Sequence, residues 1–166
     1  CVVIDAPFVN ENTSCVGVDH KQAQIDVARK TIEENKSKRI LYIAGKRNGY
    51  VTDERIKGME ELVKEKNLTM MIRNGEFSEL QARNITLKYA KNKDVVICAS
   101  DLMAIGAMKA LIEMDIFRPV CGFDGLILMG YAGKQMNTIR QDFAAVSAAA
   151  VEEMQYLLQG GKGRCV

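Results

Sequence analysis

Short apolar runs alternate with longer amphipathic segments along most of the chain. The apolar runs predict strands at Val2–Asp5, Val16–Asp19, Ile40–Ala44, Thr69–Ile72, Val95–Ala99 and Val120–Phe123. The amphipathic segments predict helices at Lys21–Glu34, Asp53–Lys66, Glu79–Ala90 and Leu102–Glu113. In the second of these helices, apolar residues recur at the helical interval and charged residues occupy the other face. Strands that alternate with helices indicate βαβ units, so we predict an α/β fold with a Rossmann-like, mainly parallel sheet flanked by helices.

The two ends of the chain depart from this alternation. Near the start, the strand Val2–Asp5 is followed by a polar loop, Asn10–Ser14, and no helix precedes it. Near the end, a short helix is predicted at Leu126–Gln135. A final alanine-rich helix, Phe143–Leu158, precedes Gly160-Gly161, which is a typical helix stop. We interpret the first strand as the last piece of a neighbouring lobe.

Two aspartates stand where predicted strands end. Asp101 follows the apolar run that stops at Ala99, and Asp124 comes 23 positions later, directly after Phe123. That interval holds about one helix and one strand, which places both carboxylates at the carboxyl ends of neighbouring parallel strands. Open α/β sheets bind their ligands at this edge. The sequence therefore predicts a small-molecule site there.

Composition and charge exclude several functional classes. The 166 residues carry 23 basic and 21 acidic side chains, and a net charge of +2 is too balanced for an electrostatic nucleic-acid-binding surface. No apolar run is long enough to span a membrane, and no signal peptide is recognisable. The five cysteines include no C-x-x-C pair, which favours a reducing cytoplasm over a disulfide framework. Because His20 is the only histidine, we predict neither a metal site nor a cofactor.

Six short motifs follow one another across nearly the whole chain. They are V-G-V-D at Val16–Asp19, R-I-L-Y-I-A-G at Arg39–Gly45, D-E-R-I-K-G at Asp53–Gly58, S-D-L-M-A-I-G-A at Ser100–Ala107, G-F-D-G at Gly122–Gly125 and N-T-I-R-Q-D-F at Asn137–Phe143. In order and spacing they resemble the effector-binding domain of the lactose-repressor (LacI/GalR) family. The same core occurs in ribose-type periplasmic sugar-binding proteins. The resemblance implies a periplasmic-binding-protein type I fold, with two Rossmann-like lobes joined by crossing strands and the ligand in the cleft.

The resemblance also implies a division of the chain. Residues 1–15 would supply a crossing strand and loop of the N-terminal lobe. Residues 16–136 would form the C-terminal ligand-binding lobe, and residues 137–166 would add a second crossing strand and the final helix of the N-terminal lobe. The family's helix-turn-helix and the first half of its N-terminal lobe have no counterpart in this sequence.

Arg55 and Asp124 match positions that bind the ligand in the family. A guanidinium offers five N–H donors, and a carboxylate accepts two hydroxyl hydrogen bonds, so the pair suits a polyol. Without the resemblance, Arg55 would be interpreted as a surface arginine. Asp124 would be interpreted as the cap of the following helix, a role that can coexist with ligand binding. Phe77 matches an aromatic residue that packs on a bound ring, with core packing as an equal alternative.

Four further residues complete the candidate ligand-binding set. Ser100 stands where the family usually has asparagine, and its shorter side chain implies a smaller, different or water-bridged ligand. Asp101 is favoured as the N-cap of the helix that follows over a ligand contact. Gln141 and Asp5 match positions that reach the cleft from the crossing strands. The loop Lys46–Asn48 would favour a phosphorylated or acidic ligand, although a solvated loop is the simpler interpretation.

Three classes of function can be built on these residues. The resemblance favours the effector-binding part of a cytoplasmic transcriptional regulator, in which a sugar, sugar phosphate or nucleoside binds between the lobes. A homodimer would pass that signal to DNA-binding heads outside this chain. The alternative is an extracytoplasmic ribose-type sugar-binding protein of an ABC transporter. An enzyme is disfavoured, because we expect His20 to lie away from the site and the chain has neither a Walker loop nor G-x-G-x-x-G.

Overall fold

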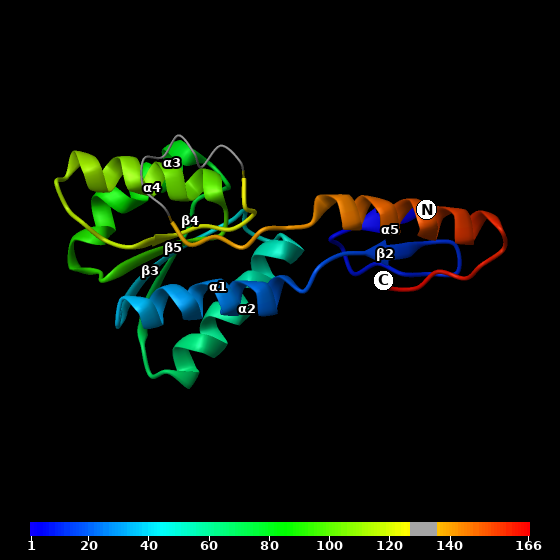
Figure 1. Ribbon diagram of the computed structural model, residues 1–166, viewed down its shortest axis with the longest axis horizontal. Helices are drawn as coiled ribbons and strands as arrows, with labels where there is room; N and C mark the ends of the chain where they lie inside the picture. The colour runs from blue at the N-terminus through cyan, green and yellow to red at the C-terminus, as the bar shows by residue number, and fades with distance from the viewer. Residues whose placement is uncertain (127–135) are drawn as a thin grey trace. The chain divides into compact units, whose positions relative to one another are not determined.

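The computed structural model describes residues 1–126 and 136–166, which form two compact units (Figure 1). The larger unit extends from His20 to Arg140, and the smaller unit combines Cys1–Asp19 with Gln141–Val166. The divisions therefore fall at 19/20 and 140/141, whereas the resemblance implied 15/16 and 136/137.

In the larger unit, helices and strands alternate as the sequence pattern indicates. Its elements in chain order are α1 (His20–Glu34), β3 (Arg39–Ala44), α2 (Tyr50–Glu65), β4 (Thr69–Asn74), α3 (Glu79–Tyr89), the 3-10 helix η1 (Ala90–Asn92), β5 (Val95–Cys98), α4 (Asp101–Glu113) and β6 (Val120–Cys121). Each of the four predicted helices is present, with small shifts at its ends. The helix predicted at Leu126–Gln135 lies, apart from its first residue, outside the described residues.

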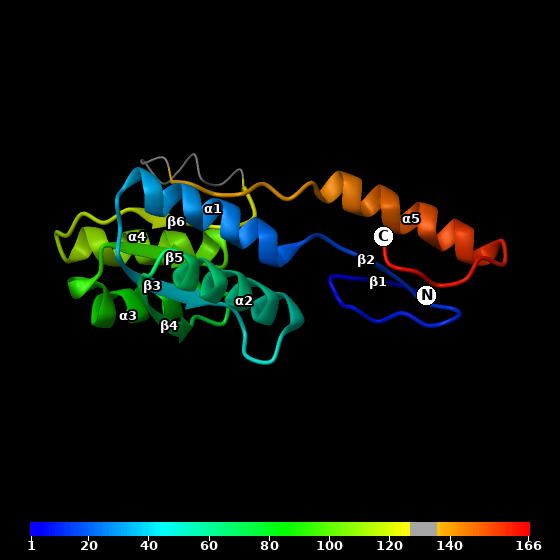
Figure 2. The ribbon, with the colours of Figure 1, turned by 90° about the horizontal axis from the view of Figure 1, so that it is seen from below.

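The four strands of the larger unit form one parallel sheet in the order β4-β3-β5-β6. In the middle of the sheet, Tyr42 of β3 lies between Ile72 of β4 and Ile97 of β5. Helices α1 and α2 pack together over one face, and α3 and α4 pack together over the other (Figures 1 and 2). This arrangement brings the carboxyl ends of all four strands to one edge of the sheet.

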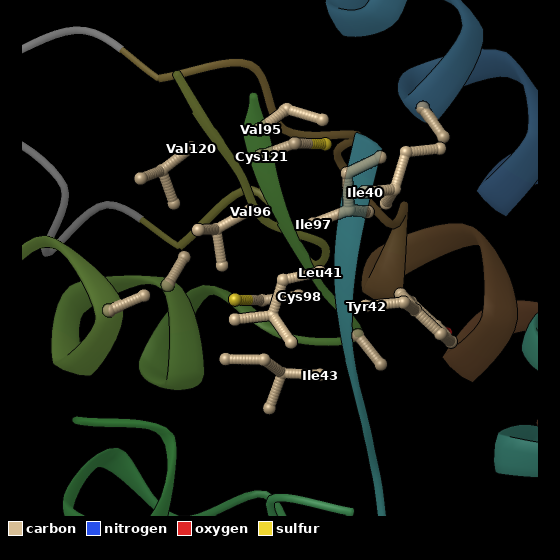
Figure 3. Close-up of a cluster of buried hydrophobic side chains, with 14 of the residues drawn as sticks. Ile40, Leu41, Tyr42, Ile43, Val95, Val96, Ile97, Cys98, Val120 and Cys121 are labelled. Atoms are coloured by element: carbon tan, nitrogen blue, oxygen red, sulfur yellow. The ribbon is translucent and has the colours of Figure 1, made fainter. Parts of the chain in front are cut away.

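The core of the larger unit lies along β3 and β5, which helices cover on both faces. Residues Ile40–Ala44 and Val95–Cys98 have no exposed surface (Figure 3). Burial on both faces explains why these strands appear in the sequence as continuous apolar runs. Each fully buried aliphatic side chain stabilises the fold by about 1.5–3 kcal/mol. The core therefore holds the strand ends that carry the candidate site.

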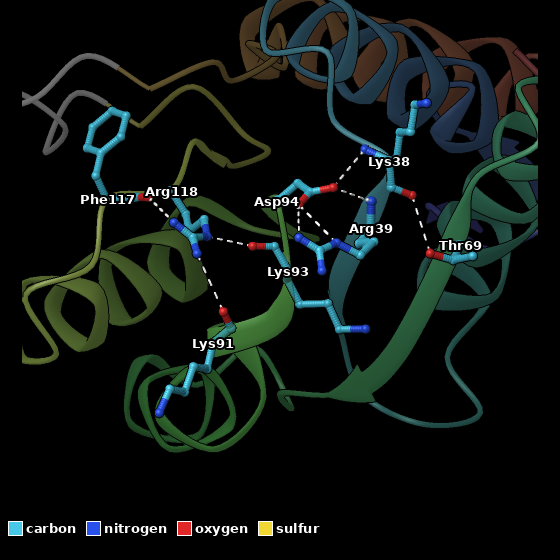
Figure 4. Close-up of polar contacts among 8 residues, drawn as sticks. All are labelled: Lys38, Arg39, Thr69, Lys91, Lys93, Asp94, Phe117 and Arg118. Carbon is cyan, nitrogen blue, oxygen red and sulfur yellow. Dashed lines mark hydrogen bonds and ion pairs between the residues drawn. The ribbon is translucent and has the colours of Figure 1, made fainter.

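At the opposite, amino edge of the sheet, Asp94 connects the beginnings of β3 and β5 (Figure 4). One carboxylate oxygen accepts hydrogen bonds from the backbone N–H groups of Lys38 (3.0 Å) and Arg39 (2.8 Å). The other accepts from the Arg39 guanidinium, at 3.1 Å from Nε and 2.7 Å from Nη2. Hydrogen bonds from the Arg39 side chain are the main reason that the pKa of Asp94 falls to about 2. Nearby, Arg118 donates to three backbone carbonyl groups, those of Lys91, Lys93 and Phe117.

The smaller unit contains two short parallel strands, β1 (Val2–Ile4) and β2 (Ser14–Val16), and the helix α5 (Phe143–Leu158). The helix matches the predicted bounds, but the strand predicted at Val16–Asp19 is wrong. The strand ends at Val16, which pairs with Ile4, and therefore lies in the smaller unit. Three residues are too few for an apolar pattern to define where a strand begins.

Glu153 of α5 connects the distant segments of the smaller unit. Its side chain is 2% exposed and accepts a hydrogen bond from the Ser14 hydroxyl at 2.8 Å. The Arg164 guanidinium pairs with the same carboxylate at 3.0 Å and lowers the pKa of Glu153. The C-terminal residues also run beside β2, where the Cys15 N–H donates to the Arg164 carbonyl at 2.9 Å. In the described part of the chain, no helix is both long and apolar enough to cross a membrane.

Candidate functional site

A buried guanidinium lies at the carboxyl edge of the larger unit's sheet. It belongs to Arg55 of α2, whose side chain is 4% exposed. Its Nη1 donates a hydrogen bond to the backbone carbonyl of Ala99, directly after β5. Its Nη2 lies 3.3 Å from Nδ1 of His20 and 3.8 Å from Oδ1 of Asp124. Of the two charged groups, Asp124 is the accessible one, because 20% of its side chain is exposed.

Topology explains why these residues meet. Strands β5 and β6 are neighbours in the sheet, so Ala99 and Asp124, which follow them, lie at the same edge. A helix that leads into a parallel strand begins at that edge too, and His20 is the first residue of α1. The structure thus brings together Arg55 and Asp124, two of the predicted ligand-binding residues. Their role in ligand binding stays a prediction.

The expectation that His20 lies away from the site is wrong. A guanidinium can only donate a hydrogen bond, so Nδ1 of His20 is the acceptor in this contact. Phe123 is a second neighbour of Arg55 that the sequence did not indicate. The Arg55 Cζ lies 3.6 Å from the centroid of this buried ring, a favourable cation–π geometry. A charge this deeply buried needs such compensation, and here it comes from a carbonyl, an imidazole, a ring and a carboxylate.

The backbone at Asp124 is strained. Its φ is +113°, a value that non-glycine residues rarely adopt, and Gly125 follows with φ +68°. The neighbouring segment holds this conformation. The Asp124 N–H donates to the Ile139 carbonyl at 3.0 Å, and the Gly125 N–H donates to the Thr138 hydroxyl at 3.2 Å. Strain of about 1–3 kcal/mol that persists because its surroundings impose it is typical of functional sites.

Ser100, rather than Asp101, is the N-cap of α4, so the predicted cap is wrong by one residue. The Ser100 hydroxyl accepts a hydrogen bond from the Met103 N–H at 3.3 Å. Asp101 is the first residue inside the helix, and its side chain points to a different partner. Both residue types suit an N-cap, so the local sequence could not decide between them.

Asp101 instead holds the segment that follows Asp124. One of its carboxylate oxygens accepts from the Leu126 N–H and the other from the Thr138 hydroxyl, each at 2.7 Å. The carboxylate is fully buried, and this burial raises the pKa of Asp101. Gly122 passes so close that a Cβ there would lie 2.1 Å from Oδ1 of Asp101. These contacts make Asp101 a positioning residue for the loop that carries Asp124.

Phe77 follows β4 at the same edge and packs against the hydrophobic core. Its ring lies over Gly45, where a Cβ would come within 2.1 Å of the ring. This observation shows the core-packing role, and contact with a ligand stays a prediction. Asp5 and Gln141 belong to the smaller unit, and their predicted ligand contacts also stay predictions. Among the described residues, no three metal-ligating side chains gather.

Comparison with protein families identifies the family to which this fold belongs. A family model described as "Periplasmic binding protein domain" matches residues 2–162, so the chain belongs to that family. Curated relatives include the HTH-type transcriptional regulator AscG of Escherichia coli K12, 22% identical over 96% of this chain and 50% of its own length. The HTH-type transcriptional repressor PurR of Histophilus somni (strain 2336) is 28% identical over 90% of this chain and 48% of its own length. The predicted resemblance to the LacI/GalR family is confirmed, and the chain spans about half the length of these relatives.

Solved structures agree on the fold. A lac repressor dimer bound to operator and an anti-inducer superposes with a TM-score of 0.86 at 20% identity, over 99% of this chain and 60% of that one. A LacI transcriptional regulator from a Rhodococcus species superposes with a TM-score of 0.89 at 20% identity, over 100% of this chain and 65% of that one. A LacI family regulator from Enterococcus faecium with bound ribose superposes with a TM-score of 0.86 at 14% identity, over 99% of this chain and 65% of that one. The predicted fold class is confirmed.

Proposed function

We propose that this chain is the effector-binding part of a LacI-family transcriptional regulator and that its ligand is a sugar-like small molecule. The observation that carries the proposal is the buried Arg55 guanidinium behind the accessible carboxylate of Asp124, at the edge where α/β sheets bind ligands. The curated relatives, which are HTH-type regulators, support the same class of protein.

The chemistry of this edge suits a polyol ring. The Asp124 carboxylate can accept hydrogen bonds from two ligand hydroxyl groups, and it lies beside the Arg55 guanidinium, which in turn contacts His20. Phe77 offers an apolar surface for a sugar or nucleoside ring. In this proposal Ser100, Asp5 and Gln141 supply further polar contacts, while Asp101 acts through the loop that it holds.

Ligand binding would then favour one arrangement of the two lobes over another. A ligand can shift such an equilibrium only by its difference in affinity for the two arrangements. In a cytoplasmic homodimer, the shift would reach DNA-binding heads that lie outside this chain. An extracytoplasmic sugar-binding protein of a transporter is the weaker candidate, because the curated relatives are named as transcriptional regulators.

Asp124→Asn in the full-length protein tests the site. A thermal-shift screen of sugars, sugar phosphates and nucleosides would find a ligand, and calorimetry would give its affinity. Loss of a charge-assisted hydrogen bond should weaken binding about tenfold or more. Asp115→Asn is the matched control, because Asp115 is also an aspartate at positive φ (+53°) and is exposed. Equal affinities of the two variants would refute the site.

A further inference from the structure

A cavity lies beside β4, the edge strand of the sheet that is opposite β6 and Asp124. Its volume is about 450 Å³, and its walls come from the carboxyl half of β4 and from α3. Strand β4 is one edge of the sheet and β6, which precedes Asp124, is the other, so two strands separate the two places. Three cationic side chains line the cavity, Arg47, Arg73 and Lys88, against one acidic side chain, Glu76.

Neighbouring groups hold the two arginines in place. The Asn74 amide donates to the Gly45 carbonyl at 3.2 Å and accepts from Nε of Arg47 at 3.3 Å, which anchors that side chain. The Arg73 guanidinium lies over the ring of Tyr89, with its Cζ 4.5 Å from the centroid, and donates to a backbone carbonyl at 2.7 Å. Preorganised donors lose less conformational entropy when they bind an anion.

The Tyr89 ring lies close to two of the cations. Nζ of Lys88 is 5.2 Å from the ring centroid, and the nearby side chains of Arg73 and Lys88 lower the pKa of the Tyr89 hydroxyl. The cavity is therefore positively charged around Tyr89, where the Arg73 and Lys88 side chains lie. A positive concave surface attracts anions and raises their local concentration.

The positive charge in this cavity exceeds the negative charge, because three cationic side chains face one acidic side chain, Glu76. In the described part of the chain, no carboxylate lies within 4.0 Å of the charged nitrogens of Arg47, Arg73 or Lys88. Elsewhere in the larger unit, Arg29 and Arg39 each form such a pair, at 2.6 and 2.7 Å. Neighbouring like charges repel one another, and a bound anion would relieve that repulsion.

We propose that this cavity binds a phosphate group, either as inorganic phosphate or as a phosphate monoester. Two guanidinium groups and one ammonium group supply more donors than the two oxygens of a carboxylate can use. A phosphate group accepts through three or more oxygens, and guanidinium groups bind it in a bidentate geometry. Although Glu76 is next to Phe77 in the chain, the cavity lining contains none of the proposed effector-binding residues, so a phosphate bound here would be a second ligand.

Calorimetric titration of the full-length protein with inorganic phosphate, at constant ionic strength, tests the proposal. Saturable binding is expected, and Arg73→Met or Lys88→Met should weaken it about tenfold or more. Lys91→Met is the matched control, because Lys91 is an exposed cation outside the cavity, and it should leave the affinity unchanged. Asp124→Asn should also leave it unchanged, which separates this site from the proposed effector site.

A parallel titration with methyl phosphate distinguishes the two sources of the phosphate group. Binding of both ligands assigns the cavity to phosphate monoesters, and binding of inorganic phosphate alone assigns it to the free ion. The proposal is overturned if no saturation occurs by about 10 mM phosphate. It is also overturned if Lys91→Met weakens binding as much as Arg73→Met does.

Discussion

Asp94→Asn should destabilise the larger unit by removing the charge that connects β3 to β5. The carboxylate uses one oxygen for two backbone N–H groups and the other for the Arg39 guanidinium. An asparagine keeps only one acceptor oxygen. Its NH2 group, which can only donate, would face either the backbone N–H groups or the Arg39 guanidinium. The variant can therefore satisfy one set of donors but not both.

The size of the effect follows from the pKa of Asp94. Its fall from the ordinary value of 3.8 to about 2 corresponds to about 2.5 kcal/mol at neutral pH. Solvent screens the pair, because the side chains of Arg39 and Asp94 are 57% and 29% exposed. We therefore expect a loss of about 1–2 kcal/mol in the free energy of unfolding.

The pH dependence has a definite sign. Because folding lowers this pKa, the stabilisation is complete above about pH 4 and is lost as the pH falls through about 2. Urea unfolding followed by circular dichroism, from pH 7 to pH 2.5, should show the wild type and the variant converging below about pH 4. Glu60→Gln, which removes an equal charge from an exposed position, is the control. The reasoning fails if both variants lose the same stability at pH 7, or if the Asp94→Asn difference is as large at pH 2.5 as at pH 7.

Two further predictions concern close packing. Gly122→Ala should lower the free energy of unfolding by about 1–3 kcal/mol, because a Cβ there would lie 2.1 Å from a buried carboxylate oxygen. The control is Gly49→Ala, because a Cβ at Gly49 would have its nearest neighbour at 3.4 Å. Equal thermal midpoints of the Gly122→Ala and Gly49→Ala variants would contradict the close approach at Gly122. In alkylation at about pH 8, followed by mass spectrometry, Cys165 should react quickly and Cys121 only after unfolding. Burial raises the pKa of Cys121 to about 12, and rapid modification in the folded protein would show that it is accessible.

The fold was predictable because its signals are local and repeated. The helices of the larger unit show several turns of amphipathic pattern, and β3 and β5 are uninterrupted apolar runs. Strand β2 was placed wrongly because it has three residues and depends on its pairing with β1. That pairing adds no periodic pattern to the sequence.

For the candidate site, the sequence predicted a residue's position only where the order of strands and helices alone determines it. The strand-end argument places Asp124 at the carboxyl edge, and the same argument applied to the first residue of α1 would have placed His20 there. The partners of Asp101, in contrast, lie 25 and 37 positions further along the chain. Local sequence contains no sign of such contacts, so the helix-cap interpretation was the natural one and was wrong.

The smaller unit is assembled from the two ends of the chain. Ser14 of β2 meets Glu153 of α5 across 139 positions, while the elements of the larger unit follow one another without interruption. During synthesis, β1 and β2 therefore leave the ribosome long before the helix and the C-terminal segment that contact them. The four described strands of the larger unit have all been made before α5 emerges. A chain cut back from its C-terminus would lose Arg164 and then α5, and so would expose β2 while every element of the larger unit is retained.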